Sequence, residues 1–264
     1  AKKMIKLVVS DVDGTLVPDG TSVVNPQLFD VILKLREKGI QVAIASGRPW
    51  ASIEKAFEPV KEKIFYISNN GAYLGCCGRS VFVTSIDRKI LEELILAGRS
   101  FPDLAMTYAG ENGDYIEDGN DRLYQWLTEG YGFRVTKVNS LLEGNEPCLK
   151  LSFYKEHGIE EAGRELFARF KDRLKITIAG DMWMDCMDPS VNKGQAVKCL
   201  QESLEILPEE TAAFGDQLND LEMLERAYYS FAVANAREEV RRAARFQADE
   251  NVKDGVLKVL RQLV

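Results

Sequence analysis

Histidine is nearly absent from this sequence. The chain has 264 residues and a single histidine, His157, so zinc sites built on histidine pairs are excluded and a Ser-His-Asp triad nearly so. His157 lies in the segment KEHG, between a predicted strand and a predicted helix, which is typical of an exposed loop. Any catalysis by this chain is therefore expected to use carboxylates, lysine, hydroxyl groups and backbone amides.

Long hydrophobic runs and paired cysteines are also missing. No apolar run approaches the roughly 20 residues that span a bilayer, and the N-terminal apolar stretch is too short, and turns acidic too soon, for a signal peptide. The 5 cysteines include no CxxC pair, and their odd number disfavours a disulfide framework. The adjacent Cys76 and Cys77 are interpreted as small apolar strand residues rather than as a redox pair. We therefore expect a cytoplasmic protein without a membrane partner.

An excess of positive charge is the third absence. The chain has 34 Lys and Arg residues against 41 Asp and Glu residues, a net charge of −7. This balance disfavours a nucleic acid partner, but it leaves room for a small phosphorylated ligand in a locally cationic, metal-bearing pocket. The remaining composition, 45% hydrophobic and 28% charged, is typical of a globular protein with one or two domains.

The N-terminal part of the chain alternates strands and helices. A buried strand over Ile5–Ser10 precedes a helix that begins at Asn25-Pro26, an N-cap followed by a first-turn proline, and that stops at Gly39. Two further apolar runs predict strands on either side of a helix that reaches Phe57. This βαβαβ order predicts parallel strands with right-handed crossovers. The two further strands are expected at Ile40–Ala45 and Ile64–Ser68.

The pattern changes between residues 85 and 187, where short strands alternate with amphipathic helices, and the earlier rhythm resumes after Pro189. We therefore predict an α/β fold class: a doubly wound, parallel, Rossmann-like core of residues 1–84 and 188–264, with an inserted α+β domain of residues 85–187. The predicted strands of the insertion are Leu104–Ala109, Asp114–Glu117, Leu149–Tyr154, Ile176–Ala179 and Trp183–Met187, and its helices are Ile90–Arg99, Arg122–Glu129 and Glu160–Lys171. The predicted elements after it are helices at Lys193–Leu204, Leu221–Ala227, Arg237–Arg245 and Val252–Leu263, and strands at Ala212–Gly215 and Ser230–Val233.

Polar residues follow several of the predicted core strands, at the point where each strand ends. Because the carboxyl ends of parallel strands meet at one edge of a sheet, residues more than 200 positions apart are expected to converge on one crevice. Two like charges as close as Asp11 and Asp13 are costly without a cation, so this pair predicts a bound metal. The converging groups are Asp11, Asp13, Ser46, Gly47, Lys193 and the segment Gly215–Asp220.

This set of side chains suits phosphoryl chemistry. Hard carboxylate oxygens are ligands for Mg²⁺, while a hydroxyl, a lysine and the amides at helix starts suit phosphate oxygens. With no suitable histidine, an aspartate is the natural nucleophile, and a neighbouring carboxylate can act as general acid and base. Trp183 lies between Met182 and Met184. We interpret it as packing in the core or at the interface of the inserted domain, which would act as a cap, rather than as a platform on which substrate stacks.

Four ordered motifs resemble those of the haloacid dehalogenase superfamily of phosphatases. The motifs are DVDGT at Asp11–Thr15, SGR at Ser46–Arg48, NKG at Asn192–Gly194 and GDQLND at Gly215–Asp220. The insertion between the second and third motifs, together with NNGA at Asn69–Ala72, resembles the Cof-like branch, which has an α/β cap. The resemblance covers nearly the whole chain and implies hydrolysis of small phosphate monoesters, such as sugar phosphates, with the cap supplying specificity.

The resemblance also implies a role for each matched residue. Asp11 would attack phosphorus and bind Mg²⁺, Asp13 would serve as acid and base and give its carbonyl oxygen to the metal, and Asp216 would be an acidic metal ligand. Gln217 departs from the branch, where a small residue is commoner, and could narrow the pocket. The phosphate or substrate would be bound by Ser46, the Gly47 amide, Lys193 and Asn219, and Asp220 would orient Lys193 or a metal-bound water.

Two alternatives to a phosphatase stay open at this point. A phosphotransferase such as a phosphohexomutase can share the DVDGT start, although the compact GDQLND segment favours the hydrolase. A non-enzymatic phospho-acceptor or ligand-binding module also uses acidic clusters and Mg²⁺, although the cap-sized insertion and Asp13 speak against it.

Overall fold

The computed structural model describes residues 4–18, 23–144 and 146–264. Its internal contacts divide the chain into two compact units. The first unit comprises Ala1–Phe82 and Asn192–Val264, and the second unit comprises Val83–Val191. The boundaries expected from the sequence were 84/85 and 187/188.

The described strands of the first unit form an eight-stranded sheet in the order β14-β13-β12-β1-β2-β3-β4-β5. All neighbours from β14 to β3 pair in parallel, and β3 pairs with β4 in antiparallel fashion. The chain runs from β1 toward β3 on one side and from β12 toward β14 on the other, so the strand order reverses beside β1, where ligands bind in such sheets. The strands are β1 (Leu7–Asp11), β2 (Gln41–Ala45), β3 (Phe65–Ser68), β4 (Tyr73–Cys76), β5 (Arg79–Val83), β12 (Thr211–Gly215), β13 (Tyr229–Val233) and β14 (Phe246–Ala248).

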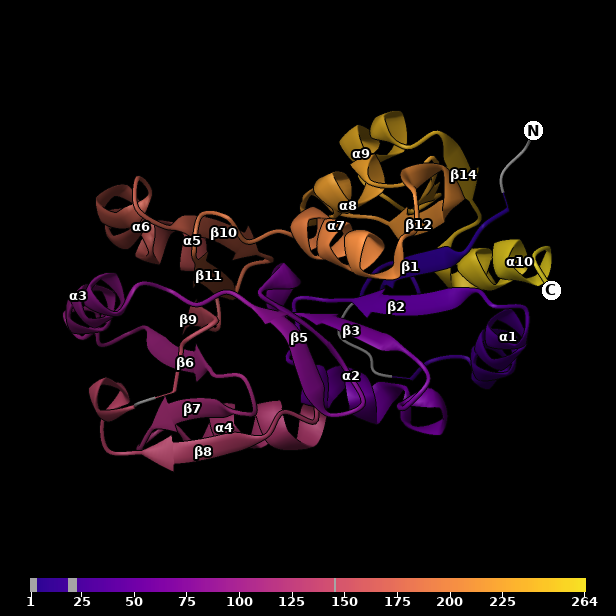
Figure 1. The fold of residues 1–264 in the computed structure, drawn as a ribbon. Coiled ribbons are helices and arrows are strands. Elements are labelled where there is room, and N and C mark those ends of the chain that lie inside the picture. Colours follow the sequence, from indigo (N-terminus) through magenta and orange to yellow (C-terminus); the bar gives the residue numbers. More distant parts are fainter. Residues whose placement is uncertain (1–3, 19–22, 145) are drawn as a thin grey trace. The chain divides into compact units, whose positions relative to one another are not determined.

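Helices cover both faces of this sheet (Figure 1). The orange and yellow helices α7, α8 and α9 lie on one face, and α1 packs against α10 on the other. Right-handed crossovers that run in opposite directions from β1 place their helices on opposite faces, which gives a doubly wound α/β fold as predicted. The helices are α1 (Pro26–Glu37), α2 (Trp50–Ala56), α7 (Lys193–Leu204), α8 (Leu221–Glu225), α9 (Glu238–Ala243) and α10 (Gly255–Arg261).

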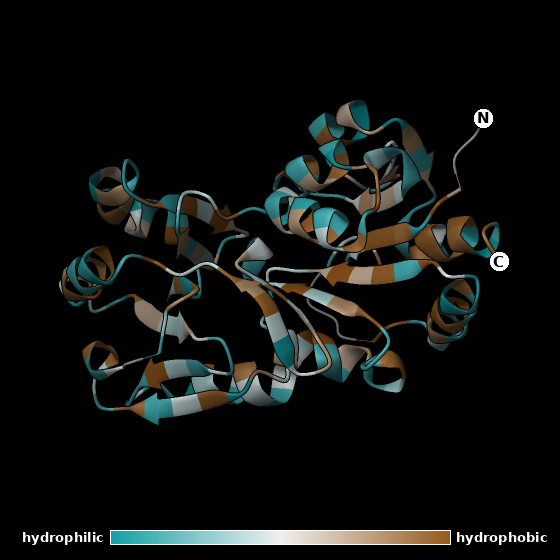
Figure 2. Ribbon diagram, in the orientation of Figure 1, coloured by the Kyte–Doolittle hydropathy of each residue, from teal (hydrophilic) through white to brown (hydrophobic). Residues whose placement is uncertain are grey.

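Local sequence explains the central elements. All five residues of β1 are buried, as expected for a parallel strand covered on both faces, and Figure 2 shows β1 and β2 as mainly hydrophobic. The Asn25 side chain caps α1 by accepting a hydrogen bond from Gln27 N at 3.0 Å. The chain leaves α1 through Gly39, whose φ of 78° favours glycine.

The described strands of the second unit form a six-stranded sheet in the order β10-β11-β9-β6-β7-β8. Its neighbours pair in antiparallel fashion except β7 and β8, which are parallel. One face of the sheet packs against α3 and α6 through residues such as Leu94, Phe153 and Phe170. The elements are α3 (Arg88–Gly98), β6 (Ala105–Ala109), β7 (Asp114–Glu117), α4 (Asp121–Gln125), a π-helical turn (Trp126–Gly130), β8 (Val135–Val138), β9 (Lys150–Tyr154), α5 (Ile159–Ala162), α6 (Arg164–Phe170), β10 (Lys175–Ala179) and β11 (Trp183–Met187).

Several local predictions were wrong. Strands β4, β5, β8 and β14 were not predicted. Of these, β5, β8 and β14 are largely exposed and therefore carry little hydrophobic signal. The helix expected over Glu160–Lys171 is split at Gly163, where a Cβ atom would lie 2.8 Å from Met184 Sδ. Cys77 is exposed, with a φ of 54°, and so lies in the turn after β4 rather than in the strand. Across the described chain, no helix is long and apolar enough to cross a membrane, and residues 1–3 of the stretch tested for a signal peptide lie outside the described residues.

Candidate active site

A tight turn follows β1 and carries the first motif. The amides of Leu16 and Val17 both donate to Val12 O, at 2.8 and 3.2 Å. Gly14 has a φ of 81°, and a Cβ atom on it would lie 2.0 Å from Asp216 Oδ2. The turn therefore requires glycine here, because only a residue without a side chain lets Asp216 approach the first motif.

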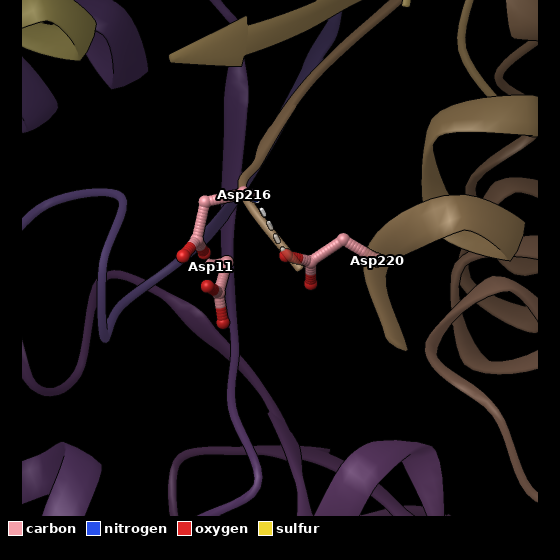
Figure 3. Close-up of side chains that lie close together, drawn as sticks. All are labelled: Asp11, Asp216 and Asp220. Atoms are coloured by element: carbon pink, nitrogen blue, oxygen red, sulfur yellow. Dashed lines mark hydrogen bonds between the residues drawn. The ribbon is translucent and has the colours of Figure 1, made fainter. Parts of the chain in front are cut away.

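Three carboxylates meet where β1 and β12 end. Asp11, Asp216 and Asp220 are 5%, 2% and 0% exposed, and one oxygen atom of each lies within 4.8 Å of the others. Figure 3 shows the three side chains close together, with the carboxylate of Asp220 turned toward the other two. Asp11 and Asp216 were both predicted as metal ligands. The structure brings them together with Asp220, which was predicted to orient Lys193 or a metal-bound water.

Lys193 lies in the middle of this cluster. Its ammonium group is 2.7 Å from Asp11 Oδ1 and 2.8 Å from Asp220 Oδ1, with 1% of the side chain exposed. Asn192 caps α7 by accepting a hydrogen bond from Gln195 N at 2.7 Å, which fixes Lys193 as the first residue of the helix. Burial alone would lower the pKa of Lys193, but the charges of Asp11 and Asp220 outweigh it and raise the pKa above its ordinary value.

The carboxylates repel one another at this distance. Burial raises the pKa of Asp11 well above its usual value, and the neighbouring charge of Asp220 adds to the rise. Burial also raises the pKa of Asp216, although the Thr15 hydroxyl, 2.9 Å from Asp216 Oδ1, opposes it. When all three carboxylates are ionised, one ammonium group leaves two negative charges uncompensated. A hard divalent cation fits this set of oxygen donors and this charge deficit.

Asp220 shapes the loop after β12 as well as holding Lys193. Its Oδ2 accepts hydrogen bonds from the amides of Asp216, at 2.9 Å, and Gln217, at 3.1 Å. Both oxygens of the Asp220 carboxylate are therefore used, one on Lys193 and the other on the backbone of the loop. This arrangement makes Asp220 a positioning residue for both Asp216 and Lys193.

Asp13 lies outside the group of three carboxylates found among the described residues and pairs with Arg48 instead. The Arg48 guanidinium binds both oxygens, through Nε at 3.0 Å and Nη2 at 2.5 Å, in the two-pronged geometry that favours arginine over lysine. The side chain of Asp13 is 32% exposed, and that of Arg48 is 7% exposed. Arg48 was not singled out from the sequence, although it belongs to the SGR motif.

The loop after β2 is fastened to β3 and the loop after it. Ser46 N donates to Ile67 O at 2.9 Å, and Asn70 N donates to Ser46 O at 3.0 Å. The Ser46 hydroxyl accepts a hydrogen bond from Arg48 N at 3.0 Å, so the proton of the hydroxyl can point elsewhere. Ser46 is buried, and a Cβ atom on Gly47 would lie 3.0 Å from Asn70 Oδ1.

The segment Asn69–Gly71 links the remaining loops. Its three residues have φ values of 49°, 61° and 100°, a run of left-handed conformations that asparagine and glycine tolerate best. Asn219, which is exposed, donates from Nδ2 to Asn70 Oδ1 at 3.4 Å. A Cβ atom on Gly71 would lie 2.2 Å from Asn192 O, directly before Lys193. The predicted site residues thus lie at the end of β1, at the start of α7 and on loops at the same edge of the first unit's sheet.

Comparison with known proteins agrees with this geometry. A family model described as haloacid dehalogenase-like hydrolase matches residues 8–260. The chain belongs to the haloacid dehalogenase-like hydrolases. The resemblance found in the four motifs, including that to the Cof-like branch, is confirmed.

Relatives of this hydrolase cover nearly all of its length. It is 25% identical to 5-amino-6-(5-phospho-D-ribitylamino)uracil phosphatase YbjI of Escherichia coli, over 97% of this chain and 95% of the relative. It is 29% identical to phosphatase YwpJ of Bacillus subtilis, over 98% of this chain and all of the relative. A crystal structure from Eubacterium rectale matches with a TM-score of 0.91 and 32% identity, over 99% of this chain and 100% of the other. The prediction that this hydrolase is a phosphatase is confirmed.

Three residues near the site of this hydrolase were missed by sequence reasoning. Thr15 contacts two of the carboxylates, Arg48 holds Asp13, and Asn70 contacts Asn219. All three stand inside motifs that the sequence analysis quoted, so the signal was present. Apart from Asp11, which is 4 positions from Thr15, their partners are 35 to 201 positions away, and such contacts become visible only after folding.

Proposed function

We propose that this protein is a Mg²⁺-dependent phosphatase that hydrolyses small phosphate monoesters through a phosphoryl group carried by Asp11. The observation that carries the proposal is the buried contact of Lys193 with both Asp11 and Asp220, beside Asp216. A structural role for these residues would leave the buried negative charges uncompensated, whereas a metal and a phosphate group make use of all of them.

The cluster and the first motif would hold the metal. Asp11 and Asp216 would supply carboxylate oxygens, and Asp13 would supply its backbone carbonyl oxygen. When bound, Mg²⁺ would neutralise negative charge on the phosphoryl oxygens. The other groups around the carboxylates, Thr15 and Lys193, fix the orientation of Asp11 from two sides.

Asp11 is the proposed nucleophile and Asp13 the proposed acid and base. The Asp11 carboxylate would form a bond to phosphorus while the bond from phosphorus to the leaving oxygen breaks, and Asp13 would give that oxygen a proton. Asp13 would then take a proton from the water that releases the phosphate. Arg48 occupies both oxygens of Asp13, so we propose that this pair opens when the substrate enters.

The remaining groups would bind the phosphate. The ammonium of Lys193, the Ser46 hydroxyl and the Gly47 amide are donors on converging loops, and Asn219 offers a further amide. Their positions favour a dianion over a neutral ligand because Lys193 carries a charge and the others only donate hydrogen bonds. Asp220 would keep Lys193 in place throughout.

The proposed substrates are small phosphorylated metabolites, in particular sugar phosphates and related compounds. The support is that the relatives are phosphatases, one of them named for a phosphorylated ribityl compound. We propose that residues 1–84 and 188–264 form the catalytic domain and that residues 85–187 form a cap that selects the leaving group. The five cysteines, all free thiols, support a reducing location such as the cytoplasm.

A phosphate-release screen tests this proposal. Sugar phosphates, nucleotides and cofactor phosphates are incubated with the protein, with and without Mg²⁺, and Asp11→Asn serves as the control. We expect free phosphate from at least one monoester, only with Mg²⁺ and only with Asp11 intact. An isomerised sugar phosphate without free phosphate would indicate a mutase instead, and a stable phosphoprotein without turnover would indicate a phospho-acceptor module.

A further inference from the structure

Four aromatic side chains gather on the second unit. The aromatic cluster, as we call it, consists of Trp126, Tyr131, Tyr154 and Trp183. The Trp183 ring centroid lies 4.9 Å from that of Tyr154 and 6.0 Å from that of Trp126, and the two indoles are nearly parallel at 18°. Tyr131 meets Trp126 edge to face at 5.1 Å. All four residues are partly exposed, whereas a cluster that served only as core would be buried.

The sheet of the second unit places a carboxylate beside the aromatic cluster. In the pairing of β9 with β11, Trp183 is opposite Tyr154 and Asp185 is opposite Ser152. Side chains two residues apart on a strand point to the same face, about 7 Å from each other. Asp185 therefore shares the face that carries Trp183 and Tyr154, opposite the face that packs on α3 and α6.

One oxygen of the Asp185 carboxylate is held by the protein and the other can accept further hydrogen bonds. It is 8% exposed, and the Ser152 hydroxyl donates to its Oδ1 at 2.7 Å. No other side-chain hydrogen bond to Asp185 is made within residues 4–18, 23–144 and 146–264. The second oxygen, Oδ2, is not among the buried side-chain atoms without a partner in the described part of the chain, so it is open to donors from water or from a ligand that brings N–H or O–H groups.

The backbone around Trp126 is also unusual. Trp126 begins the π-helical turn Trp126–Gly130, which continues from α4. Turns of this kind are rare and are frequent at functional sites. Leu127 is buried at 1% exposure and anchors the turn, while Trp126 beside it keeps its ring near the surface. The π-helical turn thus changes the direction in which the side chain of Trp126 would project from a regular α-helix.

We propose that the aromatic cluster and Asp185 form a binding site for a planar heterocycle that carries N–H groups, such as a pyrimidine, purine or flavin ring. Aromatic side chains stack on any such ring, and a carboxylate accepts hydrogen bonds from its edge. A sugar phosphate without a ring system would gain neither interaction. The kinetic tests of this proposal rest on the proposed phosphatase function, since they take the heterocycle as part of a phosphorylated substrate, whereas the binding test does not. The proposal replaces the sequence interpretation of Trp183 as a packing residue.

Two matched pairs of substrates test the proposal. Uridine 5′-monophosphate and ribose 5-phosphate differ by a heterocycle, as do flavin mononucleotide and ribitol 5-phosphate. We expect kcat/KM to be higher for the compound with the heterocycle in at least one pair, by roughly tenfold, the order that stacking on one aromatic residue supplies. Equal values within both pairs would overturn the proposal.

Variants then show whether the cluster causes the preference. Trp183→Leu and Asp185→Asn should each reduce the preference to less than about threefold by raising KM for the compound with the heterocycle, with the other compound unchanged. Trp183→Phe should restore most of it. Phe246→Leu is the matched control, because Phe246 is a 41% exposed aromatic residue on β14 of the first unit. A fall of equal size for both members of a pair would assign Trp183 a packing role and overturn the proposal.

A binding measurement separates this proposal from the phosphatase proposal. Riboflavin, which carries no phosphate, is titrated with the full chain, and quenching of its fluorescence is followed. We expect quenching by the wild type and by Asp11→Asn, and at least a fivefold weaker response from Trp183→Leu at a temperature where circular dichroism shows it folded. If no monoester is hydrolysed but quenching depends on Trp183, the phosphatase proposal fails and the ring site stands. If phosphate is released but no variant of the cluster alters quenching or the substrate preference, the ring site fails alone.

Discussion

The two units of this protein bury charged side chains in different ways. At the strand ends of the first unit, Lys193 contacts Asp11 and Asp220, and the backbone satisfies the rest of Asp220. On the sheet of the second unit, Asp114 has a buried oxygen, Oδ1, without a hydrogen-bond partner among the described residues, and Asp185 has one side-chain partner. The first arrangement holds its side chains in one geometry, as a catalytic site requires. The second leaves carboxylate oxygens that can accept hydrogen bonds from a ligand.

Removing the nucleophile should give the largest effect. Asp11→Asn keeps the shape of the side chain but cannot attack phosphorus, so turnover should fall by about 10⁴-fold or more. Steady-state phosphate release measures the loss, and circular dichroism shows whether the variant is folded. More than a tenth of the wild-type rate in Asp11→Asn would remove Asp11 from its proposed role.

Removing the buried cation should break the paired network of the first unit. Lys193→Met leaves Asp11 and Asp220 without their ammonium partner, and breaking a buried pair in this way costs about 3–5 kcal/mol of unfolding free energy. Urea unfolding measures the cost. Lys198→Met is the matched control on the same helix, since Lys198 is exposed, and it should change stability by less than about 0.5 kcal/mol. Similar free energies of unfolding for the two variants would contradict the pairing of Lys193 with Asp11 and Asp220.

The second unit should respond to pH through Asp114. Burial raises the pKa of Asp114 to about 7 from 3.8, although Lys150 opposes the rise. The folded state therefore holds this proton more tightly than the unfolded state, and its contribution to stability is lost as pH rises from 3.8 to about 7. Asp114→Asn should remove this slope and be more stable than the wild type at pH 8 by roughly 2–4 kcal/mol. Urea unfolding at pH 5 and pH 8 measures both slopes, and parallel slopes would contradict the assignment.

Two glycines of the first unit share a backbone conformation but differ in their surroundings. Gly14 and Gly39 have similar φ values, 81° and 78°, but a Cβ atom on Gly14 would meet Asp216 at 2.0 Å while Gly39 has no atom within 4 Å. Gly39→Ala should cost about 1 kcal/mol through backbone strain alone. Gly14→Ala should cost about 1–3 kcal/mol more and displace Asp216. Equal unfolding midpoints for the two variants would show that Asp216 does not rest on Gly14.

The sequence predicted that the site residues gather in one place, but it did not predict which side chains contact one another. Because parallel strands end at one edge, Asp11, Lys193 and Asp216 could be placed together from a pattern of apolar runs alone. The pair of Asp13 with Arg48 could not be predicted, since it depends on the path of the loop after β2. The roles of these residues stay predictions until they are measured.

Prediction also missed local features of the second unit. Strand β8 is four residues long and largely exposed, so it carries little hydrophobic signal. The π-helical turn at Trp126 adds one residue to a helical turn, which no amphipathic pattern reveals. The grouping of Trp126 with Trp183 depends on this turn and on the register of β9 with β11, and both are set by tertiary packing.

The most direct test of the account is mass spectrometry of the protein quenched with acid during turnover of a hydrolysed monoester. The account predicts one phosphoryl group on the peptide that contains Asp11, formed only while substrate remains and missing from Asp11→Asn. A phosphoryl group on any other residue would contradict it. Asp13→Asn lacks the proposed base and should therefore accumulate the intermediate, so an Asp11 peptide that stays unmodified in this variant would also contradict it.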